Sequence, residues 1–198
     1  EAPEAAFEFL NPRLRDLCDP SSMLDLERAV ERIAAAIRRK ERIVVFGDYD
    51  VDGTTSAAIM TLGIEAIGGE AKALVANRAL GGYGLSAPAL ERCLESDPSL
   101  LITCDCGSSD HPRVADARAR GVDVIVIDHH LVPEEELPAF AFLNPHQPNC
   151  GFPYKGFASA GLAFVVIARL RRLLNSNFDV RELLDLVALG TVADVAPL

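Results

Sequence analysis

Long apolar runs and positive charge are the two features that this sequence most clearly lacks. No uninterrupted apolar stretch approaches the length of a membrane span, so we expect no transmembrane helix. The N-terminal segment EAPEAAFEFLNPRLRDL is acidic and lacks the basic start and apolar stretch of a secretory signal. Lysine and arginine number 19 against 29 acidic residues, a formal net charge of −10. A nucleic-acid substrate would therefore need cations, or further parts of the protein, to attract it.

The number and spacing of the cysteines do not indicate a disulfide framework. The cysteines are five in number, which is odd, and they are scattered through apolar surroundings at Cys18, Cys93, Cys104, Cys106 and Cys150. Reduced thiols fit this pattern better than disulfides, and we expect a cytoplasmic location. Cys104 and Cys106 flank Asp105 at strand spacing, so we expect them to pack on the face opposite Asp105 rather than to bind a metal.

Helical and strand patterns alternate along the chain. The 198 residues, 49% hydrophobic and 24% charged, suffice for one substantial domain, 1–198, with 1–22 as an N-terminal arm. Apolar spacing and turn residues predict helices over 23–40, 54–67, 87–95, 110–120, 158–174 and 180–189, and strands over 43–46, 71–75, 100–104, 122–127 and 140–143. This alternation predicts a doubly wound α/β fold, with a mainly parallel sheet and helices on both faces.

Three apolar segments stop abruptly on an aspartate, at Asp48, Asp105 and Asp128. Because the carboxyl ends of parallel strands meet at one edge of a sheet, we expect these side chains to converge where ligands bind. Several buried carboxylates cannot share a small crevice without cations, since repulsion and desolvation would force them to take up protons. The sequence therefore predicts divalent ions at this edge.

The segment GDYDVDG carries the highest density of candidate ligands. Asp48, Asp50 and Asp52 alternate, so an extended backbone would place the three carboxylates on one side, and such oxygen ligands suit Mg²⁺ or Mn²⁺. Thr54 or Thr55 is expected to cap the next helix. An acidic surface turn and a calcium loop are the alternatives, but a calcium loop needs a late Glu where an apolar helix follows. Because the cluster repels itself, loss of Asp52 should cost the metal-free protein little stability.

The adjacent pair His129 and His130 follows Asp128. Neighbouring residues on an extended backbone point to opposite sides, so we expect His129 to bind metal and His130 to face a substrate phosphate. Such a pair alone is more often structural, and the prediction depends on Asp105 and Asp128 ending neighbouring strands. Asp194 lies in a stretch of Val, Ala and Leu, where a carboxylate is costly to bury without a cation.

Taken in order, the segments GDYDVDG, CDCGSS, DHH and GTVADVAPL resemble the DHH phosphoesterase superfamily. The connecting segments ANRALGGYGLS and NPHQPNCGFPYKGFASAGLAF are similar to its RecJ branch, the single-strand-specific 5′ to 3′ DNA exonucleases. The resemblance runs from about residue 12 to the end. It implies a metal-dependent exodeoxyribonuclease of DNA repair and recombination, which acts on single-stranded DNA with a helicase and a single-strand-binding protein.

The resemblance also implies roles for individual residues. Two Mn²⁺ or Mg²⁺ ions would be held by Asp48, Asp50, Asp52, Asp105, His129 and Asp194. Asp105 would bridge the ions, and Asp128 would orient a histidine or a ligand without binding metal. Direct catalytic roles would fall to Asp52, Asp105, His129 and His130, and contacts with substrate phosphates to Arg78, His130, Ser108 and Ser109. Cys106 stands where an Asn is common in this family.

RecJ proteins continue into a DHH-associated domain and an oligonucleotide-binding barrel, so the resemblance implies a chain truncated before both, with weak activity by itself. Two alternatives remain. One is another hydrolase of the superfamily: a nano-RNase, a cyclic dinucleotide phosphodiesterase or a pyrophosphatase. The other is a non-catalytic replication scaffold, which should have lost ligands that are intact here.

Overall fold

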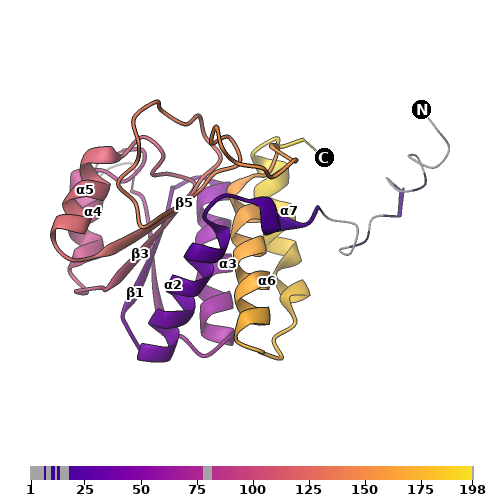
Figure 1. Ribbon diagram of the computed structural model, residues 1–198, viewed down its shortest axis with the longest axis horizontal. Helices are drawn as coiled ribbons and strands as arrows, with labels where there is room; N and C mark the ends of the chain where they lie inside the picture. Colours follow the sequence, from indigo (N-terminus) through magenta and orange to yellow (C-terminus); the bar gives the residue numbers. More distant parts are fainter. Residues whose placement is uncertain (1–6, 8–9, 12, 14–17, 78–81, 198) are drawn as a thin grey trace.

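The computed structural model describes residues 7, 10–11, 13, 18–77 and 82–197, so most of the expected N-terminal arm lies outside the described residues. The strands are β1 (Ile43–Gly47), β2 (Ala71–Val75), β3 (Leu100–Cys104), β4 (Asp123–Ile127) and β5 (Ala141–Leu143). The α-helices are α2 (Leu26–Arg39), α3 (Val51–Ala66), α4 (Ala87–Leu94), α5 (His111–Ala119), α6 (Ser159–Leu173) and α7 (Leu184–Ala193), and the short 3-10 helices are η2 (Pro20–Ser22) and η3 (Val180–Leu183) (Figure 1).

The five strands form one parallel sheet in the order β2-β1-β3-β4-β5. Its register places Gly47 beside Cys104, and Cys104 beside Ile127. The ladder continues one residue beyond these ends, because the amide of Asp48 donates to the Cys104 carbonyl at 3.1 Å and the amide of Asp105 to the Ile127 carbonyl at 2.9 Å. The residues that follow three neighbouring strands therefore leave the sheet at the same edge, as the sequence predicts.

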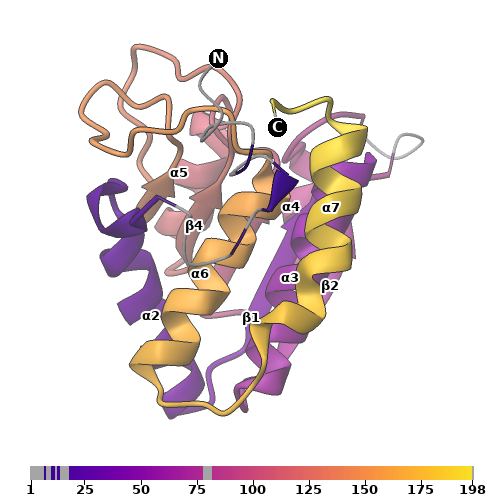
Figure 2. The ribbon, with the colours of Figure 1, turned by 90° about the vertical axis from the view of Figure 1, so that its right-hand side faces the viewer.

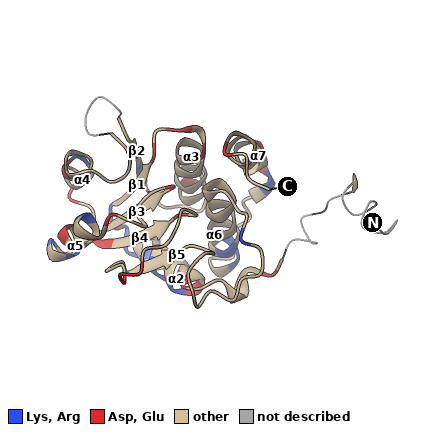
Figure 3. Ribbon diagram, turned by 90° about the horizontal axis from the view of Figure 1, so that it is seen from above, with Lys and Arg blue, Asp and Glu red and all other residues tan. Residues whose placement is uncertain are grey.

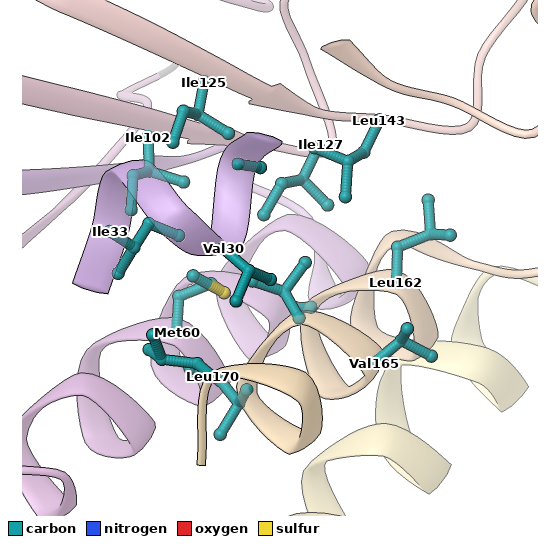
Figure 4. Close-up of a cluster of buried hydrophobic side chains, with 14 of the residues drawn as sticks. Val30, Ile33, Met60, Ile102, Ile125, Ile127, Leu143, Leu162, Val165 and Leu170 are labelled. Carbon is teal, nitrogen blue, oxygen red and sulfur yellow. The ribbon is translucent and has the colours of Figure 1, made fainter. Parts of the chain in front are cut away.

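Helices cover both faces of the sheet, which confirms the doubly wound α/β fold. Helices α2, α3, α6 and α7 lie on one side of the sheet and α4 and α5 on the other (Figures 2 and 3). Alternate strand residues supply the two cores: Val45 and Ile102 face α2, α3 and α6, whereas Val44 and Leu101 face α4 and α5. Figure 4 shows part of the larger core, to which Val30 of α2 and Met60 of α3 both contribute.

Helix α6 is the central helix of the larger core. It packs against α2, α3 and α7, and ten of its fifteen residues are buried, far more than an amphipathic surface helix would bury. Its N-terminus lies beside Asp52, at the edge of the sheet where the strands end. No helix in the described ranges is long and apolar enough to cross a membrane.

Candidate metal centre

Three aspartates at the strand ends form the floor of the site. Asp48, Asp105 and Asp128 are each at most 1% exposed. Asp105 has a φ of 62°, in the left-handed region that non-glycine residues seldom occupy. Gly107 follows with a φ of 113°, and a Cβ atom there would lie 2.7 Å from the Thr103 hydroxyl. The chain turns sharply at Asp105, and Oδ1 of its carboxylate lies 3.2 Å from the imidazole of His129, which follows the neighbouring strand β4.

The GDYDVDG segment does not stay extended, which corrects two predictions. Helix α3 begins at Val51, three residues earlier than expected, so Asp52 lies in its first turn. Its N-cap is Asp50, whose Oδ1 accepts a hydrogen bond from the Gly53 amide at 2.8 Å. The prediction of Thr54 or Thr55 as the cap is wrong, because Asp50, three residues before Gly53, already accepts from the first turn of the helix. The three aspartates still converge, but by a turn into a helix and not along one face of a strand.

Asp52 lies directly against the N-terminus of α6. Its two carboxylate oxygens accept hydrogen bonds from the Ser159 amide at 2.7 Å and the Ala160 amide at 2.9 Å. The Ser159 hydroxyl in turn lies 3.2 Å from Oδ1 of Asp105. A negative charge is favoured there, because the first amides of a helix have no partners within it and carry partial positive charge. Helix α6 therefore fixes two of the predicted ligands at once.

His129 lies at the centre of the carboxylates. Its Nε2 is 3.2 Å from Oδ1 of Asp105 and 3.8 Å from Oδ2 of Asp52, and its Nδ1 is 3.8 Å from Oδ2 of Asp194. Asp194 caps the C-terminus of α7, which runs four residues further than predicted. The site thus draws its groups from strand ends and from two helices that are distant in the sequence.

His130 is held by Asp128. Its Nδ1 lies 2.7 Å from Oδ1 of Asp128, and its Nε2 lies 3.1 Å from the hydroxyl of Tyr83. Burial raises the pKa of Asp128, but hydrogen bonds from His130 and Ser108 outweigh it and hold that pKa below its ordinary value. Asp128 accepts from a ring nitrogen of His130 and not of His129, but both imidazoles lie near Oδ1 of Asp105, at 3.2 Å for His129 and 3.8 Å for His130. The expected division of roles between the two histidines stays a prediction.

Three overlapping sets of ligand atoms could hold cations. The atoms of each set lie within 4.8 Å of one another, and the sets are Asp105 with His129 and His130, Asp52 with His129 and Asp194, and Asp48 with Asp50 and Asp105. Among the described residues, Oδ2 of Asp48 is buried without a hydrogen-bond partner, and buried Nε2 of His129 lies 3.2 Å from Oδ1 of Asp105 without the geometry of a hydrogen bond. Such atoms are costly to bury unpaired, so a bound cation fits these residues. All six predicted ligands belong to these sets.

Burial dominates the electrostatics of the site. It raises the pKa of Asp105 to about 7, although the neighbouring imidazole opposes the shift. It also raises the pKa values of Asp48 and Asp52. The hydrogen bond to Asp128 raises the pKa of His130 to about 9. Without cations the cluster therefore resists deprotonation, which is the behaviour expected of carboxylates placed together to bind positive ions.

The metal-free protein should lose stability as the pH rises. The pKa of Asp105 is raised from 3.8 to about 7, and that of His130 from 6.5 to about 9. Between its two pKa values, each group keeps a proton in the folded state that it releases in the unfolded chain. Its contribution to stability is therefore complete below its unfolded-state pKa and is lost as the pH rises through its folded-state pKa. Thermal melts in chelator should therefore give a lower melting temperature near pH 9 than near pH 5. Asp105→Asn should reduce the fall in melting temperature over the lower part of the pH range, where Asp105 titrates. A melting temperature that rises with pH would contradict the prediction.

The contacts of Asp52 change what its removal should do. Asp52→Ala leaves two α6 amides without an acceptor. We therefore expect the free energy of unfolding of the metal-free protein to fall by about 0.5–2 kcal/mol, whereas repulsion among the carboxylates alone predicts almost no change. Asp52→Asn keeps an acceptor oxygen without the charge and should lose less. Chelator melts of both variants measure the difference. A metal-free Asp52→Ala protein that melts above the parent would show that repulsion outweighs the cap.

The residues predicted to contact substrate phosphates lie in different surroundings. Arg78 lies outside the described residues. Ser109 is exposed, whereas Ser108 is 2% exposed and its Oγ accepts a hydrogen bond from Asn144, so Ser108 has a partner inside the protein. These phosphate roles stay predictions.

Cys104 and Cys106 are both buried and their thiols are free. The prediction that both pack on the face opposite Asp105 is wrong: Cys104 belongs to the core with α2, α3 and α6, and Cys106 to the core with α4 and α5, because the left-handed turn at Asp105 breaks the alternation of the strand.

Sequence reasoning did not select Ser159, Asn144 or Tyr83, which all touch the predicted residues. Asn144 could have been noticed, because it follows the predicted strand 140–143 just as the aspartates follow theirs. Ser159 and Tyr83 carry no such signal: one opens a helix and the other lies in a glycine-rich loop.

The chain matches the model of the DHH family, N-terminal domain, over residues 42–191. It is 40% identical over 200 residues to the single-stranded-DNA-specific exonuclease RecJ of Haemophilus influenzae (strain ATCC 51907 / DSM 11121 / KW20 / Rd), an alignment that covers 96% of this chain and 34% of the relative. The chain thus spans about a third of the length of that curated relative.

Solved structures agree with this likeness. A crystal structure of exonuclease RecJ bound to manganese superposes with a TM-score of 0.80 at 34% identity and covers 88% of this chain and 44% of that one. The crystal structure of RecJ in complex with Mn²⁺ from Thermus thermophilus gives a TM-score of 0.77 at 32% identity, over 96% of this chain and 26% of that one.

Proposed function

The chain belongs to the DHH family and is related within it to the RecJ exonucleases, and from this we propose that it is the catalytic domain of a divalent-metal-dependent 5′ to 3′ exonuclease for single-stranded DNA. One observation supports the proposal: seven carboxylate and imidazole side chains from strand ends and helices, the six predicted ligands and His130, meet in overlapping ligand sets, and Oδ2 of Asp48 is buried there without a hydrogen bond. We assign residues 1–198 to this domain. A DHH-associated domain and an oligonucleotide-binding barrel would complete the full-length protein.

Mn²⁺ or Mg²⁺ is the cofactor we propose, because the site mixes carboxylates with imidazole. Two ions would be held by Asp48, Asp50, Asp52, Asp105, His129 and Asp194. Asp105 and His129 each belong to two of the three ligand sets, which supports the bridging role of Asp105. When bound, the ions would supply a hydroxide nucleophile and neutralise charge on the phosphate and the leaving oxygen.

The chain's own groups would orient the substrate. His130 is fixed at Nδ1 by Asp128, which leaves Nε2 toward the Tyr83 hydroxyl and the exterior. The hydrogen bond to Asp128 raises the pKa of His130 and so favours the protonated imidazole, which can donate from Nε2 to a phosphate oxygen. Asp128 would therefore act by holding His130. Arg78, Ser108 and Ser109 remain the further phosphate contacts that we propose.

The acidic balance of the chain bears on the substrate. With a formal net charge of −10, this domain by itself offers little attraction for phosphates. We propose that the cations and the other parts of the full-length protein supply that attraction, and that the isolated domain is weakly active. We further propose that the protein works in the cytoplasm, in DNA repair and recombination. Its partners there would be a helicase and a single-strand-binding protein.

The test uses the full-length protein and end-labelled oligonucleotides. With Mn²⁺, single-stranded DNA should be shortened from the 5′ end with release of 5′-mononucleotides, and blunt duplex should remain nearly intact. Chelator should stop the reaction because the ions supply the nucleophile. Release of label from the 3′ end first, or preference for cyclic dinucleotides or pyrophosphate, would assign the protein to a different hydrolase of the superfamily.

A further inference from the structure

Asn144 connects the three loops that follow β3, β4 and β5. It comes directly after β5 and is fully buried. Its Nδ2 donates to the backbone carbonyl of His130 at 2.8 Å and to Oγ of Ser108 at 3.2 Å, and its Oδ1 accepts from the amide of His146 at 2.8 Å. Each polar atom of this side chain therefore has a partner, as buried amides require.

Ser108 extends this connection to Asp128. The Ser108 amide donates to Oδ2 of Asp128 at 3.0 Å, and its hydroxyl also hydrogen-bonds to that carboxylate. The other oxygen, Oδ1, accepts from the His130 amide at 3.2 Å and lies 2.7 Å from the His130 Nδ1. The bonds close a ring that runs from Asn144 through Ser108, Asp128 and His130 back to Asn144. The ring holds both the backbone and the imidazole of His130.

We propose that Asn144 is a positioning residue that sets the orientation of the His130 imidazole for substrate, an inference that rests on the function proposed above. Asn144 belongs to none of the three ligand sets, and of the residues in the ring only His130 does. The six proposed metal ligands all lie outside the ring, so the effect of Asn144 on the metals should be small. Its donated bonds fix the His130 carbonyl and the Ser108 hydroxyl, the two points from which the Asp128–His130 pair is held. Without them, the pair can turn and the Nε2 atom is no longer directed outward.

The kinetic test compares Asn144→Ala and Asn144→Asp in the full-length protein. Asn144→Asp keeps the size and the oxygen that accepts from His146 but removes both donated bonds, so it serves if the alanine variant folds poorly. We expect kcat on single-stranded DNA to fall about 10- to 100-fold, with KM and Mn²⁺ affinity changed by less than about threefold. Gln147→Ala is the matched control, because its amide donates at 2.6 Å to the carbonyl of Phe142, outside the ring.

A double-mutant cycle separates positioning from general damage. If Asn144 acts through His130, adding Asn144→Ala to His130→Ala should cause no further loss of kcat, because the ring has nothing left to orient. Additive losses in the cycle, or a parallel fall in Mn²⁺ affinity, would overturn the proposal.

An NMR measurement tests the ring without substrate. With ¹⁵N-labelled histidine and Mg²⁺, the full-length protein should show a protected Nδ1–H signal from His130, assigned by its loss in His130→Ala. The signal should persist in Gln147→Ala and shift or vanish in Asn144→Asp. An unchanged signal in Asn144→Asp would refute the positioning role. Failure of the wild-type protein to degrade single-stranded DNA, with the signal responding as expected, would instead refute only the proposed exonuclease function.

Discussion

Asp105→Asn in the full-length protein should reduce exonuclease turnover by about a thousandfold or more. The substitution keeps the size of the side chain but removes the charge from the group that belongs to two ligand sets. A neutral amide binds divalent cations more weakly than a carboxylate, and loss of a group shared by two ions should weaken both. Calorimetric titration with Mn²⁺ should show the loss of most binding, and single-strand degradation assays should show the loss of turnover.

Asp116→Asn is the matched control for this experiment. Asp116 is exposed on α5, on the face of the sheet opposite α3 and α6, and belongs to none of the ligand sets. This variant should keep wild-type Mn²⁺ stoichiometry and turnover. Unchanged stoichiometry and affinity in Asp105→Asn would refute the bridging role, and unchanged turnover would refute a catalytic metal at Asp105.

Gly53→Ala should strongly destabilise the protein, although alanine favours helices. A Cβ atom on Gly53 would lie 2.6 Å from the backbone nitrogen and oxygen of Asp48, a contact that no change of rotamer relieves. In an ordinary helix interior the same change would stabilise by roughly 0.5–1 kcal/mol. Here we expect the free energy of unfolding to fall by about 1–3 kcal/mol or more, because overpacking against backbone forces it to move. Denaturant unfolding of the chain measures both the sign and the size.

The same variant should also impair metal binding. Gly47 and Gly53 permit the close approach of β1 and α3, since a Cβ on Gly47 would clash with the carbonyl oxygen of Gly53. Separating the two elements displaces Asp48 relative to Asp52, so Mn²⁺ affinity should fall together with stability. Thr54→Ala, at the next and exposed position, should change both quantities little. A Gly53→Ala protein as stable as the parent would show that the elements can separate without cost.

The sequence alone determines much of the fold because the relevant patterns are local. Apolar runs of strand length alternating with helical spacing predict the parallel sheet, and the observed strands match within a residue or two. Because parallel strands end at a common edge, Asp48, Asp105 and Asp128 had to converge once the sheet formed. The starts of α2 and α3 and both ends of α7 were predicted less accurately, since caps and last turns depend on contacts that periodicity does not encode.

Only the tertiary structure decided how the site is held. Asp52 accepts its hydrogen bonds from residues 107 and 108 positions away, at the start of α6, and no local pattern encodes such a pairing. The contact of His129 with Asp105, the bond between His130 and Asp128, and the ring through Asn144 likewise depend on loops brought together by the sheet. The types of ligand are a property of the sequence, because chemistry requires carboxylates and imidazole. Their distances, burial and orientation are properties of the packed fold, because they depend on which distant segments meet.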